Sequence, residues 1–99
     1  MIESKQILQF LSDNKERWLK EYQIEKVGIF GSCARGEQKE NSDIDLIIEF
    51  SLNTQDLYSK KSKIKKEIET KFNTPVDICR EKYINPFFRK HILSEAIYV

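Results

Sequence analysis

The stretch GIFGSCARGEQKENSDIDLIIEF, residues 28–50, contains two strand-like runs joined by a short polar segment. The first run ends at Gly31-Ser32, and after ten intervening residues the second carries Asp43-Ile44-Asp45. Because side chains alternate along a strand, Asp43 and Asp45 are expected to project from one face, with Cα atoms about 6.6 Å apart. Carboxylates this close repel each other unless a cation lies between them, and hard oxygen ligands suit magnesium. The spacing therefore suggests a site for divalent metal ions.

The glycine and serine before this segment suggest a phosphate site. Gly31 lets the backbone turn sharply and approach a ligand, and Ser32 is expected to begin a short helix through Arg35. The first N–H groups of that helix and the Ser32 hydroxyl can donate to phosphate oxygens. Arg35 could contact a triphosphate, or it could pair with Glu37 or Asp43. Taken separately, the two motifs are also explained by an ordinary strand-to-helix turn and a solvated strand edge. Their combination favours a site that binds a nucleoside triphosphate.

Outside this stretch, the pattern predicts helices and strands in the order α, β, β, α, β, α. Ser4 is expected to cap the first helix, in which Ser12-Asp13-Asn14 either forms a kink or starts a second short helix. Asn53 or Thr54 is expected to open the long helix, and Thr74-Pro75 to stop it. The predicted strands cover 24–30, 42–50 and 76–79, and a last helix after Asn85-Pro86 contains Phe88, Ile92 and Ala96. This order predicts an α+β fold, a short mixed sheet of three or four strands with helices packed mainly on one face.

Composition limits the classes of protein to which the chain can belong. Ninety-nine residues with 39% hydrophobic and 33% charged side chains are expected to form one domain over 1–99. A net charge of +1 argues against direct nucleic-acid binding. Two cysteines are too few for a disulfide scaffold, and no signal-like or membrane-length apolar run is present. The expected setting is the cytoplasm, with free thiols and no membrane contact.

The segments FGSCARGE (30–37) and SDIDLIIEF (42–50) resemble the consensus of the nucleotidyltransferase superfamily that includes DNA polymerase beta. More narrowly, the chain resembles the minimal nucleotidyltransferases, small proteins usually encoded beside HEPN-domain partners. The resemblance continues through PVDICR (75–80) and the terminal AIYV (96–99). It therefore covers nearly the whole chain.

The resemblance implies a third acid at Asp77. From the residues alone, Asp77 lies between the apolar Val76 and Ile78 and faces away from the core, as many solvated strand residues do. Neighbouring strands are about 4.8 Å apart, close enough for Asp77 to join Asp43 and Asp45. In the family, the third acid binds metal or acts as general base for the attacking hydroxyl.

The site implied by the resemblance consists of Asp43, Asp45 and Asp77 as catalytic and metal-binding residues, with Gly31, Ser32 and Arg35 around the nucleotide. The implied cofactor is Mg²⁺, with two ions expected, and the implied substrate is ATP. The reaction would transfer AMP to a tyrosine hydroxyl of a HEPN ribonuclease toxin, so the chain would act as an antitoxin. Two alternatives remain open: an antitoxin that inhibits by binding alone, and a transferase acting on a small molecule such as an aminoglycoside.

Other residues are first assigned structural roles. Cys33 and Cys79 are expected to be structural, and the lysines of the long helix to form a solvated surface. Most of the C-terminal aromatics Tyr83, Phe87, Phe88 and Tyr98 are expected in the core. Any that remain exposed would mark a surface for a partner.

Overall fold

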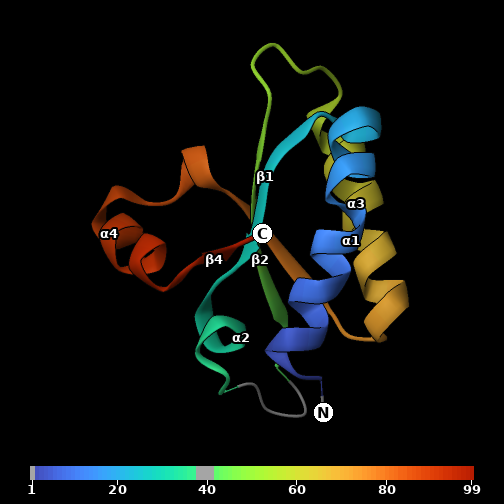
Figure 1. The fold of residues 1–99 in the computed structure, drawn as a ribbon. Coiled ribbons are helices and arrows are strands. Elements are labelled where there is room, and N and C mark those ends of the chain that lie inside the picture. Colours follow the sequence, from blue (N-terminus) through green and yellow to red (C-terminus); the bar gives the residue numbers. More distant parts are fainter. Residues whose placement is uncertain (1, 38–41) are drawn as a thin grey trace.

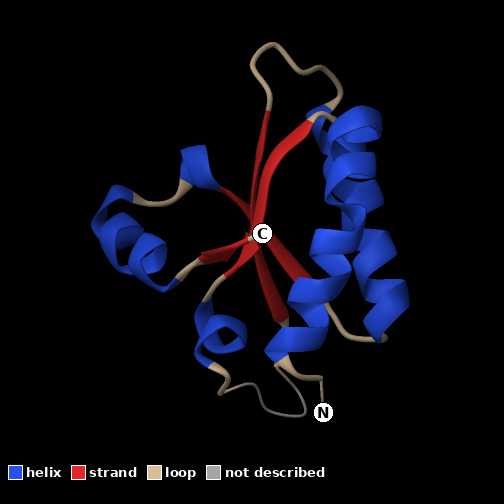
Figure 2. Cartoon of the chain, viewed as in Figure 1, coloured by secondary structure: helices blue, strands red, loops and turns tan. Residues whose placement is uncertain are grey.

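The computed structural model describes residues 2–37 and 42–99 and contains a four-stranded mixed sheet (Figures 1 and 2). The strands lie in the order β3-β2-β1-β4; β1 is antiparallel to β2 and β4, whereas β2 and β3 are parallel. The elements are α1 (Ser4–Tyr22), β1 (Ile24–Ile29), α2 (Gly31–Arg35), β2 (Ile44–Phe50), α3 (Leu57–Phe72), β3 (Val76–Arg80), the 3-10 helix η1 (Glu81–Tyr83), α4 (Pro86–Glu95) and β4 (Ile97–Tyr98). The predicted α+β class and mixed sheet are confirmed.

Helices α1 and α3 lie side by side on one face of the sheet, where the hydrophobic core is located (Figure 1). Strand alternation sends apolar side chains into this layer, including Leu46 and Ile48 of β2. Trp18 of α1 and Ile64 of α3 are fully buried against them. Helices α2 and α4 lie beyond the other side of the sheet, and α4 contains no buried residue. The prediction that helices cover mainly one face is therefore confirmed.

Helix α1 runs without interruption through Ser12-Asp13-Asn14, and its N-cap is Glu3 rather than Ser4. Glu3 and Gln6 form a reciprocal capping box. Within the helix, Gln9 donates to Asp13 (2.8 Å), and Asn14 donates to the Phe10 carbonyl (2.8 Å). The polar side chains therefore bond inside the helix instead of breaking it.

Two boundaries differ from prediction at the ends of α3 and α4. Asn53 and Asp56 have positive φ angles of 65° and 56°, so α3 begins only at Leu57. Ala96 is the extended C-cap of α4 and not part of the helix. The chain then forms β4, which the sequence did not predict, and Val99 N donates to Val27 O (3.1 Å) beside it.

Among the described residues, no helix has both the length and the apolar character needed to cross a bilayer.

Candidate active site

The register of the parallel strands brings two of the predicted acids together. Asp45 of β2 and Asp77 of β3 are directly opposite each other, on the face away from α1 and α3. Neighbouring strands in a sheet are about 4.8 Å apart, so both carboxylates project into the same region. Asp43 is exposed at the entry to β2, where Ile44 N donates to the Pro75 carbonyl (2.9 Å) and begins the pairing.

The surroundings of Asp45 disfavour the ionised form of its carboxyl group. Desolvation, followed by repulsion from Asp77 and Asp43, raises the pKa of the half-buried Asp45 above its usual value. Arg35 acts in the opposite direction on the same pKa, which places its positive charge near this carboxylate. A cation held between the acids would relieve the repulsion.

Gly31 packs its backbone against Asp45. Its φ is +66°, and an added Cβ would lie 2.7 Å from Asp45 Oδ2. Phe30 N also donates to the Asp45 carbonyl (3.0 Å), so the end of β1 is fastened to the start of β2. A side chain at position 31 would collide with the carboxylate, and the left-handed backbone already favours glycine there. The structure places Gly31 against Asp45, whereas the predicted approach of its backbone to a ligand stays a prediction.

Helix α2 is attached to its neighbours through the buried Cys33. The Cys33 thiol donates to the Asp43 carbonyl (3.7 Å), and Ser4 of α1 donates to the Cys33 carbonyl. Burial raises the pKa of the Cys33 thiol, so this sulfur stays protonated and packs as a small apolar group. Cys79 is half-buried on β3, and both cysteines are free thiols, as predicted. Ser32 is half-exposed beside Gly31.

Arg35 forms two ion pairs, one of which connects α2 with α4. Its Nε lies 3.0 Å from Glu37 Oε2, and its NH1 lies 2.8 Å from Glu95 Oε2. The pairing with Glu37 was one of the predicted alternatives, whereas Glu95 was not foreseen. Glu95 lies 60 positions along the chain, and no local pattern connects it with Arg35.

The donor chemistry of these residues fits Mg²⁺. Asp45 and Asp77 offer hard oxygen atoms on facing strands, and repulsion between them leaves a need for positive charge. Within residues 2–37 and 42–99, no three His, Cys, Asp or Glu side chains are gathered into a complete ligand cage. Mg²⁺ typically takes one or two carboxylates together with substrate phosphate oxygens rather than an all-protein cage, so the arrangement suits a metal that arrives with a nucleotide.

Comparison with known proteins identifies the family to which the chain belongs. A family model described as "Nucleotidyltransferase domain" matches residues 7–99. A relative from Methanocaldococcus jannaschii, named "Putative protein adenylyltransferase", is 35% identical over 95 residues, which is 95% of each chain. A relative from Thermococcus cleftensis, named "Protein adenylyltransferase MntA", is 27% identical over 99 residues, covering 100% of this chain and 98% of that one.

Solved structures share the fold. A structure titled as a minimal nucleotidyltransferase superposes with a TM-score of 0.79 at 27% identity, covering 97% of this chain and 95% of the other. A chain from a crystal structure of a toxin–antitoxin with AMP-PNP has a TM-score of 0.66 at 16% identity, with coverage of 98% and 72%. The latter shows likeness of fold alone. The chain belongs to the nucleotidyltransferase domain family and is a nucleotidyltransferase of the minimal type.

Proposed function

We propose that this chain transfers AMP from ATP to a tyrosine hydroxyl of a HEPN ribonuclease toxin and thereby acts as its antitoxin in the cytoplasm. Asp43, Asp45 and Asp77 are the proposed catalytic and metal-binding residues. Gly31, Ser32 and Arg35 are the proposed nucleotide-binding residues, and Mg²⁺, as two ions, is the proposed cofactor.

One observation carries the proposal: Asp45 and Asp77 face each other across β2 and β3 while the Gly31 backbone lies against Asp45. This places a sharp turn, suited to phosphate, beside two acids whose repulsion calls for cations. The choice of a protein acceptor is supported by the names of the relatives, which are protein adenylyltransferases. The toxin partner is supported by the toxin–antitoxin chain whose fold this chain shares.

In the proposed reaction, Asp77 accepts the proton of the acceptor hydroxyl. The hydroxyl oxygen forms a bond to the α-phosphorus of ATP, the bond from that phosphorus to the β-phosphate bridge breaks, and pyrophosphate leaves. Bound Mg²⁺ would supply charge neutralisation for the phosphates. Ser32 and the backbone after Gly31 donate to the triphosphate, and Arg35 adds a positive charge near it. Positioning and electrostatics account for most of the catalysis in such transfers.

The alternative of inhibition by binding alone would not require the acidic set. A pure binder gains nothing from holding Asp45 where desolvation and then repulsion by Asp77 and Asp43 raise its pKa. A small-molecule transferase is the other alternative, and transfer to an aminoglycoside in place of protein would identify it.

The test is incubation with ATP, Mg²⁺ and the protein encoded by the neighbouring gene, followed by intact-mass measurement of that protein. We expect an increase of one or more AMP units with the wild-type chain. Asp43→Asn and Asp45→Asn should each reduce the transfer rate by about a thousand-fold or more, equivalent to about 4 kcal/mol of transition-state stabilisation. Asp13→Asn, which removes an exposed carboxylate on α1, is the matched control and should transfer normally.

Neutralisation of the partner that survives Asp45→Asn, with no adduct on the wild-type partner, would favour inhibition by binding. An adduct on a residue other than tyrosine would correct the acceptor while leaving the transfer reaction intact.

A further inference from the structure

Three aromatic side chains lie exposed on the segment that follows β3. The exposed fractions are 68% for Tyr83 in η1, and 90% and 57% for Phe87 and Phe88 at the start of α4. The rings of Phe87 and Phe88 touch edge to face, with centroids 6.0 Å apart. Helix α4 buries none of its residues within the described chain. We call Tyr83, Phe87 and Phe88 the aromatic surface; Phe87 and Phe88 contact each other, and Tyr83 precedes Phe87 by four residues in the chain. Exposed aromatic side chains of this kind are typical of an interaction site.

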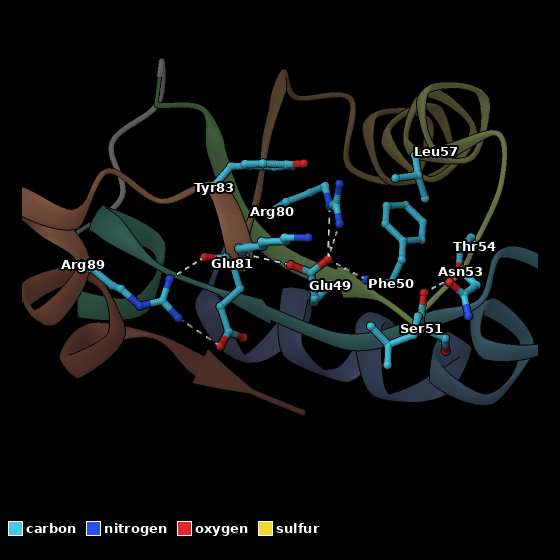
Figure 3. Close-up of a pocket in the computed structure, with 12 residues that line it drawn as sticks. Glu49, Phe50, Ser51, Asn53, Thr54, Leu57, Arg80, Glu81, Tyr83 and Arg89 are labelled. Carbon is cyan, nitrogen blue, oxygen red and sulfur yellow. Dashed lines mark hydrogen bonds and ion pairs between the residues drawn. The ribbon is translucent and has the colours of Figure 1, made fainter.

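A hollow of about 510 Å³ is lined in part by Tyr83 of the aromatic surface (Figure 3). Tyr83 lies on one side of it, and Leu52, which is 93% exposed, lines it from the β2–α3 loop. The guanidinium of Arg80 lies 4.8 Å from the centroid of the Tyr83 ring and 5.5 Å from that of Phe50. The hollow is therefore lined by the apolar groups of Tyr83 and Leu52 and by the guanidinium of Arg80, which stacks on the neighbouring aromatic rings.

The acidic side chains around the hollow are largely buried, whereas most of the basic side chains beside them are more exposed. Glu49 accepts hydrogen bonds from Arg80 (2.8 and 3.0 Å) and from the backbone N–H of Lys82 (2.8 Å), and its side chain is 18% exposed. Glu81 is 16% exposed and pairs with Lys26 and Arg89, the latter being 41% exposed. Because both acids are paired and mostly buried, they contribute little negative charge to the surface that another protein would contact.

The cations beside the aromatic surface remain available. Lys82 and Lys90 are exposed, and within residues 2–37 and 42–99 neither has an acidic ion-pair partner within 4 Å. Lys82 Nζ lies 5.9 Å from the centroid of the Tyr83 ring, and Lys90 follows Phe87 and Phe88 on α4, whereas Arg89 is paired with Glu81. A complementary partner would present apolar side chains flanked by aspartate or glutamate.

We propose that the aromatic surface and the adjoining hollow dock the protein that accepts AMP, through an apolar segment of that protein bearing acidic side chains. The proposal rests on the proposed function and names the surface by which the acceptor is held. Strand β3 carries Asp77 near its start and continues through Arg80 into η1 and Tyr83. A segment docked on this surface would lie at the end of β3, three to six residues beyond Asp77 along the chain, so the acceptor must also extend along the sheet to reach Asp77.

Charge also argues against a second copy of this chain as the occupant. A two-fold interface places the same patch of both copies in contact. Lys82 and Lys90 of one copy would then be brought close to those of the other, and like charges brought together oppose association. The same cations therefore favour association with an acidic partner protein and disfavour association with a second copy of this chain.

The experiment measures the affinity of the full chain for the protein encoded by the neighbouring gene, alongside transfer of AMP to it. The double variant Phe87→Ser with Phe88→Ser should weaken the dissociation constant and raise KM for the protein acceptor at least ten-fold. Lys82→Glu with Lys90→Glu should do the same, more strongly at low salt. Affinity for ATP with Mg²⁺, measured without the acceptor, should stay unchanged in both variants.

Matched controls come from the opposite side of the molecule. Leu19→Ser removes an exposed apolar side chain of α1, and Lys65→Glu reverses an exposed lysine of α3. Both should bind the acceptor as the wild type does. Because Phe87 and Phe88 are exposed, their variants are expected to fold, which circular dichroism can verify.

Equal acceptor affinity in the wild type and the aromatic variant would overturn the docking proposal, as would the absence of any complex with the wild type. A wild-type dimer that the aromatic variant converts to a monomer would instead assign the surface to a second copy. Failure of the proposed function has a different signature, namely a complex that depends on the aromatic surface but acquires no AMP.

Discussion

The two faces of the sheet differ in what their side chains do. On the face covered by α1 and α3, the apolar residues of the strands are buried, and Trp18, Leu46 and Ile64 have no exposed surface. On the other face lie Asp45, its neighbour Asp77, and α4, a helix without a buried residue. One face is closed and apolar, whereas the other, the open face, carries the acids, although Ile47 on this face is fully buried.

This difference assigns stability and function to separate layers. Burial of apolar side chains supplies most of the free energy of folding, so the closed face can hold the sheet in place. The open face then tolerates groups that oppose folding, such as the repelling carboxylates around Asp45. Variants on the closed face should affect stability, and variants on the open face should affect activity or binding.

The largest expected stability effect is that of Trp18→Ala on the closed face. The indole is fully buried, and its Nε1 donates to Glu67 of α3 (3.2 Å), so truncation removes packing and a link between the two helices. We expect the free energy of unfolding to fall by about 3–5 kcal/mol in chemical denaturation. AMP transfer per folded molecule should remain close to wild type. A loss below about 1 kcal/mol would contradict the assignment of stability to this face.

The next effect in size is expected at Gly28, where β4 pairs antiparallel with β1. A Cβ at this position would lie 2.4 Å from the Ile97 carbonyl oxygen and 2.9 Å from Tyr98 Cα, and both are backbone atoms. Gly28→Ala should therefore displace β4 and lower the free energy of unfolding by about 1–3 kcal/mol. Faster hydrogen exchange at Val99, whose N–H donates to Val27, would locate the damage. Unchanged exchange there would show that β4 accommodates the methyl group.

The parts of the molecule that the sequence predicted well depend on local periodicity. Alternation along β2 correctly separated Ile44, Leu46 and Ile48 from Asp45, because one face of the strand is buried. The facing position of Asp77 followed from the same alternation on β3 once the strands were taken as neighbours. The roles of these acids in catalysis stay predictions that the kinetic variants must test.

The parts that the sequence did not predict depend on contacts between distant segments. Strand β4 has two residues, too few for an alternating pattern, and exists because it pairs with β1. The ion pair of Arg35 with Glu95 joins α2 to α4 across 60 positions. The sequence also did not predict that Phe87 and Phe88 are exposed, because an apolar helix face gives the same pattern whether the protein's own core or a partner covers it.

A smaller effect is expected from Asp45→Asn on stability, with its sign set by the raised pKa of Asp45. As pH rises from the ordinary carboxyl pKa of 3.8 through the raised value, the folded chain holds its proton longer than the unfolded chain does. Stability therefore falls across that window, and the penalty is complete at neutral pH. The asparagine variant escapes it and should be more stable at neutral pH by less than about 1 kcal/mol, because solvent screens a half-buried charge.

Thermal unfolding at several pH values would test this, with Asp13→Asn controlling for the change in net charge. The gain should disappear well below pH 3.8, where Asp45 is protonated in both the folded and the unfolded states. A gain that persists there would show that its origin is neither the desolvation of the Asp45 carboxylate nor its repulsion by Asp77 and Asp43.

The smallest stability effect is expected for Phe87→Ser on the open face. The ring is 90% exposed and contacts Phe88, so the folded chain loses little packing when it is removed. We expect the free energy of unfolding to change by no more than about 0.5 kcal/mol, as for other surface substitutions. Chemical denaturation measures this value alone and again with the acceptor protein present at saturation. The wild type should gain more stability from the acceptor than the variant does, because a ligand that binds only the folded state stabilises it according to its affinity. Equal stabilisation of the wild type and the variant by the acceptor would contradict the assignment of partner binding to the open face.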